Sequence, residues 1–161
     1  MTRTSLILAA AGGSAALLAG AYLFQALGYP PCPMCWWQRY PHFVAVAIGA
    51  LALVARGPAL PWLGAMAALT TSAIGVMHTG VERGWWTIQT SCTGGGDLGS
   101  LSGADLLSTE APRIVMCDQV AWSLFGISMA SWNAIFSAVL VVLWVLAARA
   151  SATSRGVTRA A

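Results

Sequence analysis

The chain has 161 residues, of which 58% are hydrophobic and only 8% are charged. A soluble globular protein carries about 25% charged residues, so this composition excludes an ordinary soluble domain and predicts a protein of the lipid bilayer. The formal net charge of +3 comes from eight basic residues, all of them Arg, and it is too small and too scattered to indicate a nucleic-acid partner.

Four apolar segments are long enough to cross a hydrocarbon core of roughly 30 Å, which takes about 20 helical residues. They cover approximately residues 6–29, 37–54, 59–81 and 120–147. The second is interrupted near its start by Arg39, Pro41 and His42. The first follows Arg3 as a signal peptide would, but it is longer than the usual 7–15-residue apolar core. We therefore expect a retained helix and an all-α membrane protein: one domain, residues 1–161, built as a four-transmembrane-helix bundle.

Charge placement predicts the orientation of these spans. With four spans, both termini and the turn at residues 56–61 share one side, which carries five Arg and no acidic residue. The opposite side carries Arg39, Arg83 and Arg113 together with all five acidic residues. Because Arg is enriched in cytoplasmic segments, we expect cytoplasmic termini. The four cysteines then lie at the exported face, where disulfides form and persist.

The cysteines form two pairs. Residues 30–41 read Pro-Pro-Cys-Pro-Met-Cys-Trp-Trp-Gln-Arg-Tyr-Pro, with Cys32 and Cys35 in a Cys-x-x-Cys pair between the first two apolar segments. Cys92 and Cys117 lie in the long polar loop, residues 90–118. A Cys-x-x-Cys pair can close a disulfide or act as a redox dithiol. If Pro33 occupies the first helical position, Cys35 lies in the first turn, where unsatisfied amides favour a thiolate.

Arg39 follows Cys35 by four residues, on the same helix face and one turn deeper. An arginine just inside a bilayer is costly and by default indicates function, although a guanidinium can also snorkel to the headgroups. Its charge can stabilise a thiolate at Cys35 and an anionic acceptor beside it.

Other interpretations of the cysteines remain open. Two static disulfides would staple a membrane scaffold without turnover. Four thiolates could also bind Zn²⁺, but the second pair lacks the close spacing of a zinc knuckle and an exported location favours oxidation, so we expect no metal. Haem attachment would need His after Cys35, where the chain has Trp36.

Small residues recur at four-residue steps in three of the segments, which allows helix backbones to approach closely in lipid. They include Gly64, Ala68 and Ser72 in the third segment. Asn133, in the fourth, is expected to hydrogen-bond another helix, and His42 to lie at the membrane interface.

Three stretches carry a family resemblance. They are the Cys-Pro-Met-Cys-Trp-Trp-Gln-Arg-Tyr-Pro run, the run from His78 to Trp86, and the run from Cys117 to Asn133. At these residues the sequence closely resembles the DsbB family, bacterial inner-membrane enzymes that reoxidise DsbA. The resemblance extends from the first helix to about Ser137. Vitamin K epoxide reductase relatives match less well, because they place the loop cysteines before the Cys-x-x-Cys pair.

The resemblance implies a membrane thiol–disulfide oxidoreductase. A DsbA-like periplasmic protein of thioredoxin fold would attack a Cys92–Cys117 disulfide at Cys92. Electrons would pass to the Cys32–Cys35 pair and from Cys35 to a quinone, ubiquinone or menaquinone, held in the membrane beside Arg39. A DsbB-like paralogue with a different dedicated donor remains an alternative.

Four further residues are candidates for quinone binding. Gln38 adjoins Arg39 and can hydrogen-bond a quinone carbonyl or a headgroup. His78, Glu82 and Arg83 lie near the exported end of the third segment, where one of them can supply a proton or a hydrogen bond. His78 and Glu82 are four residues apart and can instead pair on one helix face.

Overall fold

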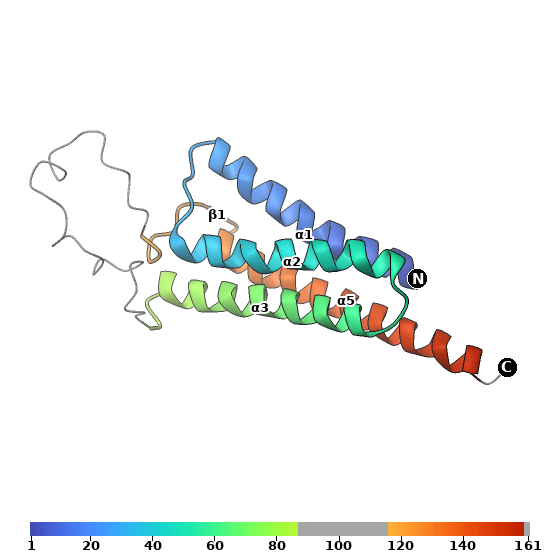
Figure 1. Cartoon of the computed structure of the whole chain (residues 1–161). Coiled ribbons are helices and arrows are strands. Elements are labelled where there is room, and N and C mark those ends of the chain that lie inside the picture. Colours follow the sequence, from blue (N-terminus) through green and yellow to red (C-terminus); the bar gives the residue numbers. More distant parts are fainter. Residues whose placement is uncertain (87–115, 160–161) are drawn as a thin grey trace, which may run out of the picture.

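The computed structural model describes residues 1–86 and 116–159, with side chains described as far as Ala152. The described elements are α1 (Arg3–Ala26), α2 (Pro33–Val54), α3 (Ala59–Glu82), β1 (Ser123–Leu124), β2 (Ile127–Ser128) and α5 (Met129–Arg159). The helices lie side by side in an elongated bundle with both termini at one end and the short antiparallel β1–β2 hairpin at the other (Figure 1). The predicted all-helical architecture is confirmed.

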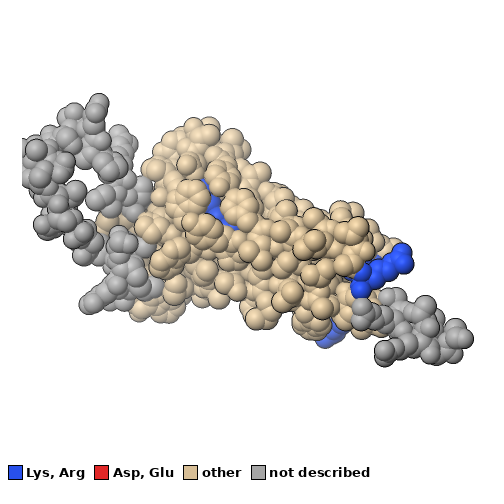
Figure 2. All heavy atoms as spheres, in the orientation of Figure 1, with Lys and Arg blue, Asp and Glu red and all other residues tan. Residues whose placement is uncertain are grey.

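Three of these helices are long and apolar enough to cross a membrane: α1, α3 and the Met129–Ala152 part of α5. Helix α2 is not one of them, because its first half carries Gln38, Arg39 and His42. The face of the molecule drawn in Figure 2 shows no acidic atoms; Arg atoms lie close to the end that holds the termini, and a small patch of Arg atoms lies among uncharged ones in the opposite half. Three of the four predicted spans are thus supported by length and composition.

Helix α2 begins as its sequence predicts. Pro33 is at its N-terminus and Cys32 is the N-cap residue, whose sulfur accepts a hydrogen bond from the Cys35 backbone N–H at 3.2 Å. Proline suits this position because its missing N–H would have no helical partner. The prediction that Cys35 lies in the first turn is confirmed, and the helix starts four residues before the apolar segment that begins at residue 37.

The predicted start of the fourth segment is wrong. Residues 120–128 are not helical, and α5 begins only at Met129. Phe125 and Gly126 have φ values of +53° and +74° in the turn between β1 and β2, a left-handed conformation that an α-helix cannot contain. The Ser128 hydroxyl then accepts a hydrogen bond from the Ser131 N–H at 3.2 Å and caps α5.

The larger cluster of buried apolar residues lies in the half of the bundle that holds the termini. Trp144 of α5 is fully buried, and a Cβ atom built at Gly64 would lie 2.6 Å from its indole ring. The Ser72 hydroxyl donates to the carbonyl of Ala134 at 2.9 Å. Both contacts confirm that small residues bring α3 against α5. The Arg3 guanidinium adds hydrogen bonds to the carbonyls of Ala52 and Ala55 at the end of α2.

Candidate active site

Three sulfur atoms meet at the end of the bundle opposite the termini. Cys32 Sγ lies 2.9 Å from Cys35 Sγ, farther than the roughly 2.05 Å of a disulfide but near enough for the pair to bond on oxidation. The Cys117 side chain also hydrogen-bonds Cys32. Cys32 and Cys117 are 2% and 0% exposed, whereas Cys35 is partly exposed. Cys92 lies outside the described residues.

The three sulfurs are not equivalent. Hydrogen bonding with Cys117 and Cys35, together with burial, raises the pKa of the Cys32 thiol above its ordinary value. Cys32 therefore keeps its proton at neutral pH. Cys35, in the first helical turn and partly accessible, is the sulfur better placed to act as the thiolate.

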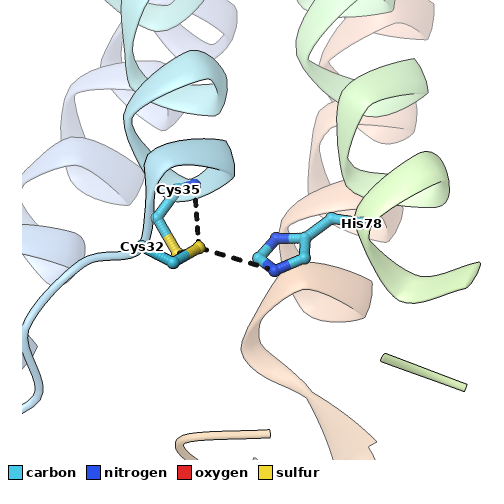
Figure 3. A group of neighbouring side chains, drawn as sticks. All are labelled: Cys32, Cys35 and His78. Atoms are coloured by element: carbon cyan, nitrogen blue, oxygen red, sulfur yellow. Dashed lines mark hydrogen bonds between the residues drawn. The ribbon is translucent and has the colours of Figure 1, made fainter. Parts of the chain in front are cut away.

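His78 reaches from α3 toward the dithiol on α2 (Figure 3). Its Nε2 lies 3.6 Å from Cys32 Sγ and 3.9 Å from a carboxylate oxygen of Glu82. His78 and Glu82 therefore lie together on one face of α3, as their four-residue spacing predicts. The Ser128 hydroxyl donates to the other Glu82 oxygen, so α3 is tied to the start of α5 immediately beside the sulfurs.

Gln38 fixes the tautomer of His78. Its amide nitrogen donates to the Met34 carbonyl at 3.3 Å and contacts His78 Nδ1 at 2.8 Å. A carbonyl can only accept, so the atom between Met34 and His78 must be the amide nitrogen, and His78 Nδ1 must be the acceptor. The ring hydrogen is therefore on Nε2, the nitrogen that faces the Cys32 sulfur.

Arg39 is 5% exposed and lies between two aromatic rings. Its guanidinium carbon is 4.7 Å from the ring centroids of both Tyr22 and Trp36. It donates to the Gln25 side-chain oxygen at 2.8 Å and to the Ala21 carbonyl at 3.3 Å. Within residues 1–86 and 116–152, no carboxylate forms an ion pair with it. The charge is held by neutral groups and is buried within the protein.

These side chains border one cavity of about 350 Å³, within the size range of small-molecule sites. Its wall is largely apolar and comes from α1, α2, the end of α3, α5 and the segment before α5. The polar residues at the wall include the predicted site residues Cys32, Cys35, Gln38, Arg39, His78 and Glu82. Arg83 does not line it: its guanidinium carbon lies 5.6 Å from the ring centroid of Trp85.

The cavity also includes two residues that sequence reasoning did not assign to it, His42 and Asn133. His42 is 2% exposed and so is packed inside the bundle, while its expected depth at the membrane interface stays a prediction. Asn133 bonds Gln38 of α2 and Thr71 of α3, which confirms that it joins helices. The sequence spacing could have placed His42 at the cavity, because it follows Gln38 by four residues and Cys35 by seven and therefore shares their helix face.

The ligand atoms of Cys32, Cys35 and His78 lie within 4.8 Å of one another, close enough to hold a metal ion. A metal would need the lone pair of His78 Nε2. The Met34–Gln38–His78 contacts instead place a hydrogen on that nitrogen. The geometry therefore favours hydrogen-bond donation to sulfur over metal ligation.

Comparison with known proteins gives one consistent family. A family model described as "Disulfide bond formation protein DsbB" matches residues 3–147. Proteins called "Disulfide bond formation protein B" are 32% identical in Aromatoleum aromaticum, over 79% of this chain and 80% of that protein, and 32% identical in Azoarcus sp., over 91% and 94%. One from Verminephrobacter eiseniae is 33% identical over 80% of this chain and 76% of its own length. No solved structure matches the chain.

Proposed function

Because the chain belongs to the DsbB family of disulfide bond formation proteins, we propose that it reoxidises a DsbA-like periplasmic dithiol protein and passes the electrons to a membrane quinone. One observation carries the proposal: Cys32 contacts the loop cysteine Cys117, while its partner Cys35 lies at the wall of an apolar cavity beside Arg39. Cys32 borders the same cavity, so the dithiol joins the loop cysteine to the cavity, and Cys35 is the more exposed of its two sulfurs.

The first exchanges begin at the loop pair. A thiolate of the donor attacks Cys92 of a Cys92–Cys117 disulfide, which forms a mixed disulfide and releases Cys117 as a thiolate. Cys117 then attacks Cys32 of the Cys32–Cys35 disulfide, and Cys35 leaves as a thiolate. Each step forms one S–S bond and breaks one. The contact between Cys117 and Cys32 supports this choice of target sulfur.

The cavity fits a quinone ring, because it is apolar and roomy and has polar groups at few points. A bound quinone supplies a two-electron, two-proton acceptor. Cys35 holds the electron-rich sulfur at the wall, Arg39 stabilises negative charge beside it, and His78 holds a hydrogen on Nε2 next to Cys32. Since the disulfide/dithiol couple of DsbA lies at about −120 mV, its dithiol is a weak reductant, and only a more oxidising acceptor can take its electrons.

We also propose how the helices are arranged in the membrane. Helix α2 is the fourth span, shielded by its neighbours at Gln38, Arg39 and His42. The end with Arg3, Arg56 and Arg149 faces the cytoplasm, and the sulfurs face the periplasm of a bacterial inner membrane. Hydrogen bonds from Arg3 to the carbonyls that end α2 support a common side for that turn and the N-terminus.

The test is oxidation of a reduced DsbA-like protein by the purified chain in lipid nanodiscs, with quinone consumption followed by absorbance. Cys35→Ser should abolish both signals. Met34→Leu, a volume-conserving change between the two cysteines, should keep turnover within threefold. Full turnover in Cys35→Ser would end the proposal.

Two alternative functions, a scaffold without turnover and a paralogue with another donor, would give different experimental results. A stapled scaffold would not reoxidise its thiols when quinone is added after mild reduction, as alkylation would show. A paralogue with another donor would reoxidise them, but Cys117→Ala would trap a protein other than the DsbA-like one.

A further inference from the structure

His42 has one ring nitrogen that the described structure leaves without a partner. Nε2 lies 3.0 Å from the side-chain oxygen of Asn133 and 3.5 Å from the Ser137 hydroxyl. Nδ1 is buried and has no hydrogen-bond partner among the described residues. The residue lines the cavity on the same helix as Cys35, seven residues further along. Buried polar atoms without partners are uncommon in folded proteins, so this one calls for an explanation.

The protonation of His42 follows from a chain of hydrogen bonds that starts at a backbone carbonyl. The Met34 carbonyl fixes the Gln38 amide nitrogen, so the other end of that amide is an oxygen. This oxygen accepts from the Asn133 amide nitrogen at 2.8 Å. The oxygen of Asn133 therefore faces His42, and Nε2 must carry the ring hydrogen.

Thr71 supports the same assignment of the nitrogen and oxygen of the Asn133 amide. Its hydroxyl donates to the Gln38 backbone carbonyl at 2.9 Å, so its oxygen accepts from the Asn133 nitrogen at 3.2 Å. Neutral His42 is thus held with a lone pair on Nδ1. That nitrogen can accept a hydrogen bond but cannot donate one.

We propose that Nδ1 of His42 accepts a hydrogen bond from a hydroxyl of the reduced ring, so that His42 distinguishes quinol from quinone; this rests on the proposed function. A quinone presents two carbonyl oxygens, which are acceptors, whereas a quinol presents two hydroxyl donors. In net terms the dithiol loses two electrons and two protons as its S–S bond forms, and each carbonyl oxygen gains one proton. The ligand becomes complementary to His42 once the oxygen that faces Nδ1 has gained its proton.

The kinetic test compares His42→Phe with wild type in nanodiscs, using decyl-ubiquinone as substrate and decyl-ubiquinol as product inhibitor. We expect the inhibition constant of the quinol to rise at least tenfold while the KM for the quinone changes less than threefold. The control Phe136→Leu alters an apolar wall residue and should affect both forms alike. A quinol inhibition constant within threefold of wild type, or an equal change in both constants, would overturn the inference.

A second measurement needs no variant and no turnover. In wild-type protein with ¹⁵N-labelled histidine, NMR should show His42 protonated on Nε2 and unprotonated on Nδ1. Decyl-ubiquinol, but not decyl-ubiquinone, should shift the Nδ1 resonance. A hydrogen on Nδ1, or an Nδ1 shift indifferent to quinol, would contradict the assignment. Failure of the proposed function appears separately, as absence of quinone-dependent dithiol oxidation in wild type.

Discussion

The side-chain nitrogen of Gln38 lies 2.8 Å from Nδ1 of His78, and this contact joins α2 to α3 beneath the Cys-x-x-Cys pair. It determines which His78 nitrogen carries the hydrogen that faces Cys32. Gln38 therefore acts on the sulfurs through His78, while both ends of its own amide are engaged by protein groups.

Replacing this amide should slow the dithiol chemistry without unfolding the bundle. In Gln38→Leu, Nδ1 of His78 loses its donor, so the ring hydrogen is no longer held on Nε2, the nitrogen beside the Cys32 sulfur. We expect oxidation of the Cys32–Cys35 dithiol by quinone to slow about tenfold to a hundredfold, measured in single-turnover stopped flow. Gln119→Leu, which also changes a cavity residue, is the matched control and should stay near wild type. Equal rates in the two variants would show that the Gln38 amide has no positioning role.

Arg39 should depend on its shape as well as its charge. The planar guanidinium stacks on Tyr22 and Trp36 and donates to two oxygens, an arrangement that Lys cannot reproduce. We expect Arg39→Lys to raise the KM for quinone roughly tenfold and Arg39→Met to remove turnover, in steady-state assays with reduced donor in excess. Turnover of Arg39→Met at the wild-type rate would show that the charge is not needed.

The packing of α3 against Trp144 predicts a stability difference between two glycines. A Cβ at Gly64 would lie 2.6 Å from the buried indole, whereas a Cβ at Gly12 meets nothing within 4 Å. Overpacking of a core costs about 1–3 kcal/mol, so Gly64→Ala should lower the unfolding temperature. Gly12→Ala should leave it unchanged or raise it, since Ala favours helix. Thermal unfolding in one detergent compares them, and equal shifts would refute the close contact.

The raised pKa of Cys32 predicts an unusual pH dependence of alkylation. A thiol with a raised pKa is still protonated where a free cysteine, with a pKa near 8.5, is half ionised. In the reduced protein, iodoacetamide should therefore modify Cys35 first, and the rate at Cys32 should still increase above pH 8.5. Cys117→Ala removes the largest cause of the shift and should move the midpoint at Cys32 downward. Peptide mass spectrometry measures both rates, and an unmoved midpoint would show that Cys117 has no such effect.

The start of α2 could be predicted from sequence because its determinants are local. Pro33 and the N-cap position of Cys32 depend on neighbouring residues, and the four-residue step from Cys35 to Arg39 places both on one face of any helix. The start of α5 could not be predicted in this way. Residues 120–127 are as apolar as a membrane helix, and nothing in that composition reveals that Phe125 adopts a left-handed conformation.

The site was predictable only in part for a related reason. Sequence spacing relates residues within one helix, and it pointed to Gln38, Arg39, and the His78–Glu82 pair. The hydrogen bonds from Asn133 to Gln38 and His42 join helices about ninety positions apart in the chain. Such contacts depend on the rotation of α5 against α2, which no periodicity specifies.

The setting of Arg39 has an energetic consequence. A guanidinium held by an amide oxygen, a carbonyl and two aromatic faces retains its full unit charge, and the low dielectric around it extends the reach of that charge. Any acceptor seated nearby gains electrons in a positive potential. Its midpoint potential should rise above that of the same molecule dissolved in lipid. By linkage, the reduced acceptor is then held more tightly than the oxidised one, so electron transfer at the site is favoured at the expense of product release.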